Sequence, residues 1–155
     1  VGAGSGHDAR LFARYGYDVT AVDFAPGAIA AMQTAADPAA TVDIRQADLF
    51  HLPRQFSMAF DYVLEYTCFC AIDPQKRPAY AAAVDQSVRP GGLVIGLILP
   101  INRGPGGPPF EARPDDYIAL FSARGYNLIR REIPADSIAP RRGNEELVIL
   151  QKPAS

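Results

Sequence analysis

Apolar and polar positions along the chain follow two different periods. Short runs rich in β-branched and aromatic residues, bounded by Asp, Gly or Pro, are typical of strands. Between them lie longer segments whose apolar residues recur at helical spacing and that begin near proline or end at glycine. These patterns predict strands at residues 17–22, 41–46, 60–65, 93–99, 126–133 and 145–151, and helices at residues 8–15, 26–36, 73–88 and 114–124.

The order of these elements indicates an α/β fold. Alternation of strands and helices favours a mostly parallel sheet with helices on both faces. The connection at 134–144 carries no helix signal, so the last two strands are predicted to pair as an antiparallel hairpin. The length of 155 residues favours a single domain over residues 1–155.

Two segments interrupt this regular order. Residues 100–112 are rich in Gly and Pro, and a loop of this length is uncommon unless it serves a function such as a lid. The chain starts at Val1, directly against a glycine turn of the kind that follows a buried strand. We therefore expect that a strand, and any helices before it, precede Val1 in a longer protein.

Composition narrows the classes of function. Lys+Arg 15 against Asp+Glu 17 gives a net charge of −2, so the basic surface on which sequence-independent nucleic-acid binding depends is not expected. The most apolar stretch, residues 93–101, is far shorter than the roughly 20 residues that span a bilayer. We expect a cytoplasmic protein, a monomer because no amphipathic stripe is left over, that contacts neither nucleic acid nor membrane.

The cysteines and histidines predict no metal site. Cys68 and Cys70 lie too close for an ordinary structural disulfide, and His7 and His51 are isolated in the sequence. Without a histidine close in sequence, the two cysteines are interpreted as packing residues rather than nucleophiles.

A glycine turn and a following aspartate predict a nucleotide-type site. Gly2, Gly4 and Gly6 precede a helix, and Asp23 ends the next strand, where a carboxylate accepts hydrogen bonds from ribose hydroxyls. The nicotinamide fingerprint has a glycine where His7 stands here, so the spacing suits S-adenosylmethionine (SAM) better. A tight turn without a ligand is the alternative.

Asp48 extends this candidate site. It follows the strand at 41–46, and an aspartate there is placed to accept from an adenine amino group at the carboxyl edge of the sheet. On spacing alone, a helix-capping aspartate is an equally good interpretation.

Several blocks resemble class I SAM-dependent methyltransferases of the thiopurine S-methyltransferase superfamily, in particular the thiol/halide methyltransferase branch. The glycine turn at 2–8 resembles a motif shared by many methyltransferases, whereas the later blocks are narrower. These later blocks are residues 65–74, 77–80, 89–92, 107–110 and 140–143. Glu65 stands where the branch commonly carries aspartate, and the family's N-terminal segment that closes over the substrate has no counterpart in the sequence.

The resemblance implies a Rossmann-like fold, SAM as cofactor and methyl transfer to a small soft nucleophile, namely a thiol, halide, thiocyanate or metalloid anion. It implies that Glu65 joins the cofactor-binding residues. Tyr66, at the end of a strand, is our candidate for the wall of the methyl-transfer pocket, because aromatic faces attract a sulfonium cation. Arg142, or Arg141 beside it, is our candidate for positioning the anion, with a solvated surface pair as the alternative.

Two other functions stay open at this point. A nicotinamide-dependent oxidoreductase uses a related glycine turn, and a non-catalytic remnant keeps a Rossmann-like shape without a reaction.

Overall fold

The computed structural model describes residues 1–102 and 104–154. The chain divides into two compact units, Val1–Leu52 and Pro53–Ser155. Each unit has its own sheet and its own buried residues. The single domain expected over residues 1–155 stays a prediction.

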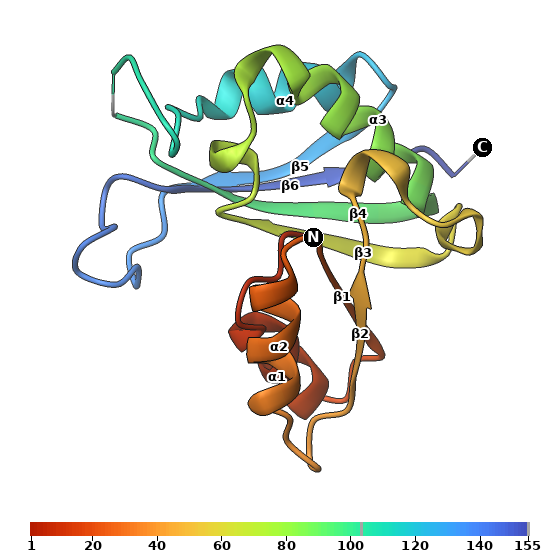
Figure 1. Ribbon diagram of the computed structural model, residues 1–155. Coiled ribbons are helices and arrows are strands. Elements are labelled where there is room, and N and C mark those ends of the chain that lie inside the picture. The colour runs from red at the N-terminus through yellow and green to blue at the C-terminus, as the bar shows by residue number, and fades with distance from the viewer. Residues whose placement is uncertain (103, 155) are drawn as a thin grey trace. The chain divides into compact units, whose positions relative to one another are not determined.

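The first unit is a two-stranded parallel sheet with two helices packed against it (Figure 1). The strands pair in parallel from Val19↔Val42 to Asp23↔Gln46, so their carboxyl ends lie side by side. Ala21, Val22 and Met32 are buried between sheet and helices. The elements are α1 (His7–Arg14), β1 (Val19–Asp23), α2 (Pro26–Thr34), β2 (Val42–Gln46) and the 3₁₀ helix η1 (Leu49–His51).

The second unit is a four-stranded sheet in the order β3-β4-β6-β5, with α3 and α4 on one face (Figure 1). β3 and β4 are parallel, while β6 is antiparallel to both β4 and β5. The predicted C-terminal hairpin is therefore confirmed. The elements are η2 (Arg54–Phe56), β3 (Phe60–Tyr66), η3 (Phe69–Ala71), η4 (Pro74–Lys76), α3 (Arg77–Ser87), β4 (Val88–Ile98), α4 (Pro114–Ser122), β5 (Asn127–Glu132) and β6 (Glu146–Gln151).

Aromatic rings form the core between this sheet and its helices. The ring centroids of Phe69 and Tyr117 lie 5.0 Å apart, those of Tyr117 and Phe121 also 5.0 Å, and those of Phe121 and Tyr126 5.3 Å. Tyr80 of α3 packs edge-on against Phe69 at 5.4 Å. These T-shaped and tilted pairs avoid the face-to-face sandwich that ring quadrupoles disfavour. The cluster thus joins η3, α3, α4 and the start of the hairpin.

The predicted elements match the observed ones closely except at the start of β4. The sequence predicts that residues 89–92 stop a helix and that the strand begins at Leu93, whereas the strand already begins at Val88. Phe60 pairs with Val88 and Tyr62 with Leu93, so this segment bulges out of the ladder. Gly91, at φ 77°, supports the bulge because glycine adopts left-handed backbone angles without a steric cost.

The described part of the 100–112 segment has neither helix nor strand, as predicted. The amide of Ala112 donates to the carbonyl of Pro100 at 2.9 Å, so the two ends of the loop are tied together. The lid function stays a prediction. Among the described helices, none has the length and apolar character needed to cross a bilayer.

The aromatic core gives a direct test of the second unit. Phe121 is 0% exposed and contacts two other rings, so Phe121→Ala is expected to lower the free energy of unfolding by about 3–5 kcal/mol through lost burial and a residual cavity. The matched control is Ile133→Ala, 57% exposed, for which a change within about 0.5 kcal/mol is expected. Urea denaturation measures both, and equal losses would contradict the packing described here.

Candidate active site

The glycine turn opens the first unit and has a left-handed backbone at alternate positions. Gly2, Gly4 and Gly6 have φ of 62°, 54° and 72°. A Cβ on Gly6 would lie 2.7 Å from Cγ of Met32, so this glycine is needed for packing against α2. A Cβ on Gly4 would meet no atom within 4 Å. The backbone at Gly4 therefore borders open space, as a ligand-binding turn requires.

Asp23 holds this turn from the end of β1. Its Oδ2 accepts a hydrogen bond from the amide of Gly4 at 2.9 Å, and its Oδ1 accepts one from the amide of Ala25 at 2.9 Å. The residue is 9% exposed. An ionised carboxylate offers about four lone-pair sites, so Asp23 retains acceptor capacity for ribose hydroxyls.

Asp48 lies one strand away at the same carboxyl edge. The amide of Ala47 donates to the carbonyl of Asp23 at 3.0 Å, which ties the ends of β1 and β2 together. The carboxylate of Asp48 caps η1 by accepting from the amide of Phe50 at 2.9 Å, and it pairs with Nδ1 of His51 at 2.9 Å. The capping interpretation is thus confirmed, while contact with an adenine stays a prediction. The structure brings the glycine turn, Asp23 and Asp48 together.

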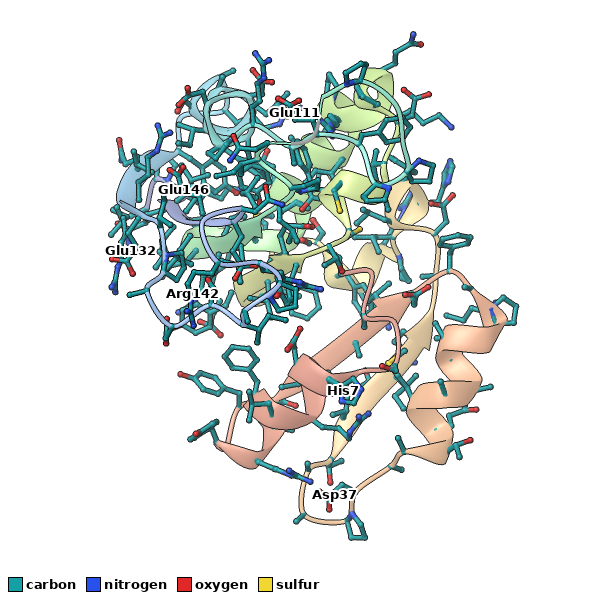
Figure 2. The ribbon with its side chains drawn as sticks, turned by 90° about the vertical axis from the view of Figure 1, so that its left-hand side faces the viewer. His7, Asp37, Glu111, Glu132, Arg142 and Glu146 are labelled. Carbon is teal, nitrogen blue, oxygen red and sulfur yellow. The ribbon has the colours of Figure 1, made fainter. Side chains whose placement is uncertain are left out.

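His7 follows the turn as the first residue of α1 (Figure 2). Its Nδ1 lies 3.3 Å from a guanidinium nitrogen of Arg10, on the exposed side of the helix. This contact within α1 agrees with a structural role for His7.

Glu65 lies in the second unit and is enclosed there. It is 1% exposed, its Oε1 accepts from the amide of Phe69 at 2.8 Å, and its Oε2 accepts from the hydroxyl of Tyr80 at 2.9 Å. Burial raises the pKa of the Glu65 carboxyl. The two hydrogen bonds lower the pKa, but burial is the larger effect. Both oxygens thus serve internal contacts, and the cofactor-binding role of Glu65 stays a prediction.

The turn after β3 is held in an uncommon backbone conformation. Thr67 has φ of 69°, a left-handed angle that is rare for a β-branched residue and costs about 1–3 kcal/mol. The bond from the Phe69 amide to Glu65 spans this strained residue. The thiol of Cys70 donates to the carbonyl of Thr67 at 3.2 Å, and burial raises its pKa, which agrees with a packing role.

Tyr66, just before this strained residue, lies between two charged groups. The guanidinium carbon of Arg141 lies 4.6 Å from the centre of the Tyr66 ring, and the Tyr66 hydroxyl donates to Oε2 of Glu145 at 3.4 Å. Burial raises the pKa of the Tyr66 phenol, and the negative charge of Glu145 raises it further. Nη1 of Arg141 is buried and has no hydrogen-bond partner among residues 1–102 and 104–154.

Of the two candidate arginines, Arg141 is the one that contacts Tyr66. Arg142 is exposed on the loop before β6 (Figure 2). Sequence reasoning missed Glu145. Its one signal is a pair of glutamates, Glu145 and Glu146, at the entrance of an apolar strand, where exposed charges would ordinarily stand.

Comparison with known proteins identifies the family. The sequence profile described as Thiopurine S-methyltransferase (TPMT) matches residues 2–152. The chain belongs to the thiopurine S-methyltransferase family. The resemblance found in residues 65–74 and the other blocks is thereby confirmed.

The family assignment is supported by plant relatives. Thiocyanate methyltransferase 1 of Brassica oleracea is 32% identical over 148 residues, which cover 94% of this chain and 65% of the relative. Probable thiol methyltransferase 2 of Arabidopsis thaliana is 35% identical over 88 residues, 57% of this chain and 39% of the relative. The chain thus spans less than two thirds of the length of these relatives.

A solved structure supports the fold of this thiopurine S-methyltransferase family member. A SAM-dependent methyltransferase from Methanosarcina mazei superposes with a TM-score of 0.81 at 17% identity, covering 99% of this chain and 91% of that one. At this identity the likeness shows the fold alone. The predicted methyltransferase-type α/β fold, with a mostly parallel sheet, is confirmed.

The buried Glu65 carboxyl gives a pH-dependent prediction. Because its pKa is raised in the folded state above the ordinary 4.5, the folded state holds a proton that the unfolded state releases. Stability is therefore expected to fall as pH rises from about 4.5 through the raised pKa. Glu65→Gln, which has no titrating proton, is expected to flatten this slope in denaturation curves recorded from pH 4 to pH 8. An unchanged slope would contradict the burial of an ionisable group at this position.

Proposed function

We propose that this protein transfers a methyl group from SAM to a small soft nucleophile, a thiol or an anion such as thiocyanate, by in-line displacement. The observation that carries the proposal is the buried Nη1 of Arg141, a charged donor beside the ring of Tyr66 that has no hydrogen-bond partner in the described part of the chain. Such a donor favours an anionic ligand. Membership of the thiopurine S-methyltransferase family and the names of the plant relatives support the same reaction class.

The residues of the first unit suit SAM. The open space at Gly4 leaves room for a ligand close to the backbone, and Asp23 and Asp48 supply acceptors for ribose hydroxyls and an adenine amino group. When bound, SAM supplies a methyl group activated by a sulfonium. We propose Gly2, Gly4, Gly6, Asp23 and Asp48 as its binding residues, with Glu65 acting by holding the turn after β3.

The acceptor is proposed to bind at Tyr66 and Arg141. The guanidinium stabilises negative charge on the attacking sulfur, and the aromatic face attracts the sulfonium cation. Soft anions need little covalent assistance, so alignment of the reactants and exclusion of water supply most of the acceleration.

The alternative functions are not favoured. A nicotinamide-dependent oxidoreductase does not agree with the family match over residues 2–152, nor with His7 in the position of the last glycine. The buried guanidinium nitrogen of Arg141, which has no hydrogen-bond partner among the described residues, favours a ligand-binding protein over a non-catalytic remnant. We also propose that the protein acts as a monomer in the cytoplasm, on small molecules rather than on nucleic acid or membranes.

Cofactor binding is tested by calorimetric titration with SAM and S-adenosylhomocysteine. Asp23→Ala removes the acceptor that orders Gly4, so binding is expected to weaken at least tenfold, with Asp18→Ala, an exposed neighbour in the same unit, as the control. The titration is made with the 155-residue chain and with the full-length gene product. Absence of binding in both would overturn the proposed function at its first step.

The two arginines give a matched pair for the acceptor. Arg141→Ala is expected to raise KM for thiocyanate at least tenfold, because a charge-assisted hydrogen bond contributes about 1.5–3 kcal/mol, whereas Arg142→Ala is expected to stay within about threefold. Transfer of labelled methyl from SAM measures both. An effect of Arg142→Ala as large as that of Arg141→Ala would contradict the assignment.

A further inference from the structure

Glu145 is a buried carboxylate that the proposed function has not used. It is 2% exposed, and its hydrogen bond to the Tyr66 hydroxyl, at 3.4 Å, is long. Its neighbour Glu146 is also buried but is paired with Arg131. A buried charge normally has a short ion pair or several hydrogen bonds. Among the ion pairs between described residues, none includes Glu145.

The hydrogen bond from Tyr66 places the carboxylate of Glu145 where it can accept a proton. The phenol donates its proton to Oε2 of Glu145, and a phenolic oxygen that donates one proton can accept another through its lone pairs. The charged groups that face Tyr66 are Glu145, just before β6, and Arg141, on the loop before it. A ligand held by Arg141 would meet an oxygen whose own proton already points at a base.

We propose that Glu145, acting through the hydroxyl of Tyr66, removes the proton from a neutral thiol acceptor. This inference rests on the proposed function and deepens it. Glu145 is then a positioning residue and a proton acceptor, and it is needed only for methyl acceptors that carry a proton on sulfur. Thiocyanate, which carries no proton at neutral pH, does not need it.

The S–H proton passes to the phenolic oxygen of Tyr66 while the original hydroxyl proton passes to Oε2 of Glu145. A sulfur lone pair forms the new S–CH₃ bond, and the C–S bond of the sulfonium donor breaks with its electron pair kept by the departing thioether. The protonated carboxyl then releases its proton to water, and the phenol is left neutral as it began.

The magnitude follows from thiol ionisation. A cysteine-like thiol with a pKa near 8.5 is only about 3% thiolate at pH 7, so an enzyme that lacks the base loses at most about 30-fold on thiols at that pH. The loss is expected to shrink as pH rises through about 8.5, because solvent then supplies the thiolate. No such loss is expected for an acceptor that is anionic at every pH used.

The experiment compares Glu145→Gln with the wild type in the full-length gene product, using thiocyanate and a panel of alkyl thiols of cysteine-like pKa. The ratio of thiol to thiocyanate kcat/KM is expected to fall by up to about 30-fold at pH 7 and to recover above pH 8.5. Glu146→Gln, which alters the adjacent buried glutamate and its pairing with Arg131, is the matched control and is expected to leave the ratio within about threefold.

The outcomes separate this inference from the proposed function. The inference would be overturned if Glu145→Gln lost equal activity on thiols and on thiocyanate, or if the wild-type enzyme methylated thiocyanate but no thiol. Either result would leave the proposed methyl transfer intact. Absence of transfer to every acceptor would overturn the proposed function itself. If the variant does not fold, the wild-type profile decides: a thiol kcat/KM that rises tenfold per pH unit up to 8.5 would show that no base assists.

A measurement that does not depend on catalysis tests the same contact between Glu145 and Tyr66. Removing the negative charge at Glu145 is expected to let Tyr66 ionise at lower pH, because that charge raises its pKa together with burial. The ultraviolet absorbance of the phenolate is titrated in the wild type and in Glu145→Gln, each with and without Tyr66→Phe. The difference made by Tyr66→Phe isolates the titration of Tyr66. An unchanged Tyr66 titration would show that the two groups do not interact and would overturn the inference.

Discussion

The enclosed carboxyl of Glu65 is the constraint on which the second unit depends. It accepts one hydrogen bond from the backbone of η3 and one from Tyr80 of α3, so a strand end, a turn and a helix share one group. Without this carboxyl, the amide of Phe69 or the hydroxyl of Tyr80 would be buried among aromatic rings without a hydrogen-bond acceptor, at a cost of about 1–3 kcal/mol each. The same bonds hold Thr67 at its left-handed angle and thereby fix Tyr66 immediately before it.

Asp23 has the corresponding role in the first unit. Its two oxygens bind amides on either side, at Gly4 and Ala25, so the glycine turn and the start of α2 are ordered by one carboxylate. In each unit a carboxylate at the carboxyl end of a parallel strand orders a neighbouring turn of the same unit. Asp23 keeps lone pairs for a ligand, whereas Glu65 is enclosed by its own unit.

Tyr66, Arg141 and Glu145 show how charge is distributed where the acceptor is proposed to bind. Burial and the anion at the hydroxyl raise the pKa of the Tyr66 phenol, whereas the cation on the ring face lowers it. One buried nitrogen of the guanidinium has no hydrogen-bond partner among the residues that the structure describes. The proposed attraction for an anion and the proposed path for a proton thus depend on two residues near the start of β6, Arg141 and Glu145.

The sequence by itself determined the elements, the glycine turn, Asp23 and the family, because periodicity, turn residues and short motifs are local properties. The sequence pattern predicts a helix end at residues 89–92 and misses the bulge there, since a β-bulge depends on the partner strand as well as on glycine. Tertiary structure alone decided that Arg141, not Arg142, contacts Tyr66, and that Glu145 is buried beside it. Adjacent residues on a loop are equivalent in sequence, and only packing against Tyr66, a residue distant in the sequence, distinguishes them.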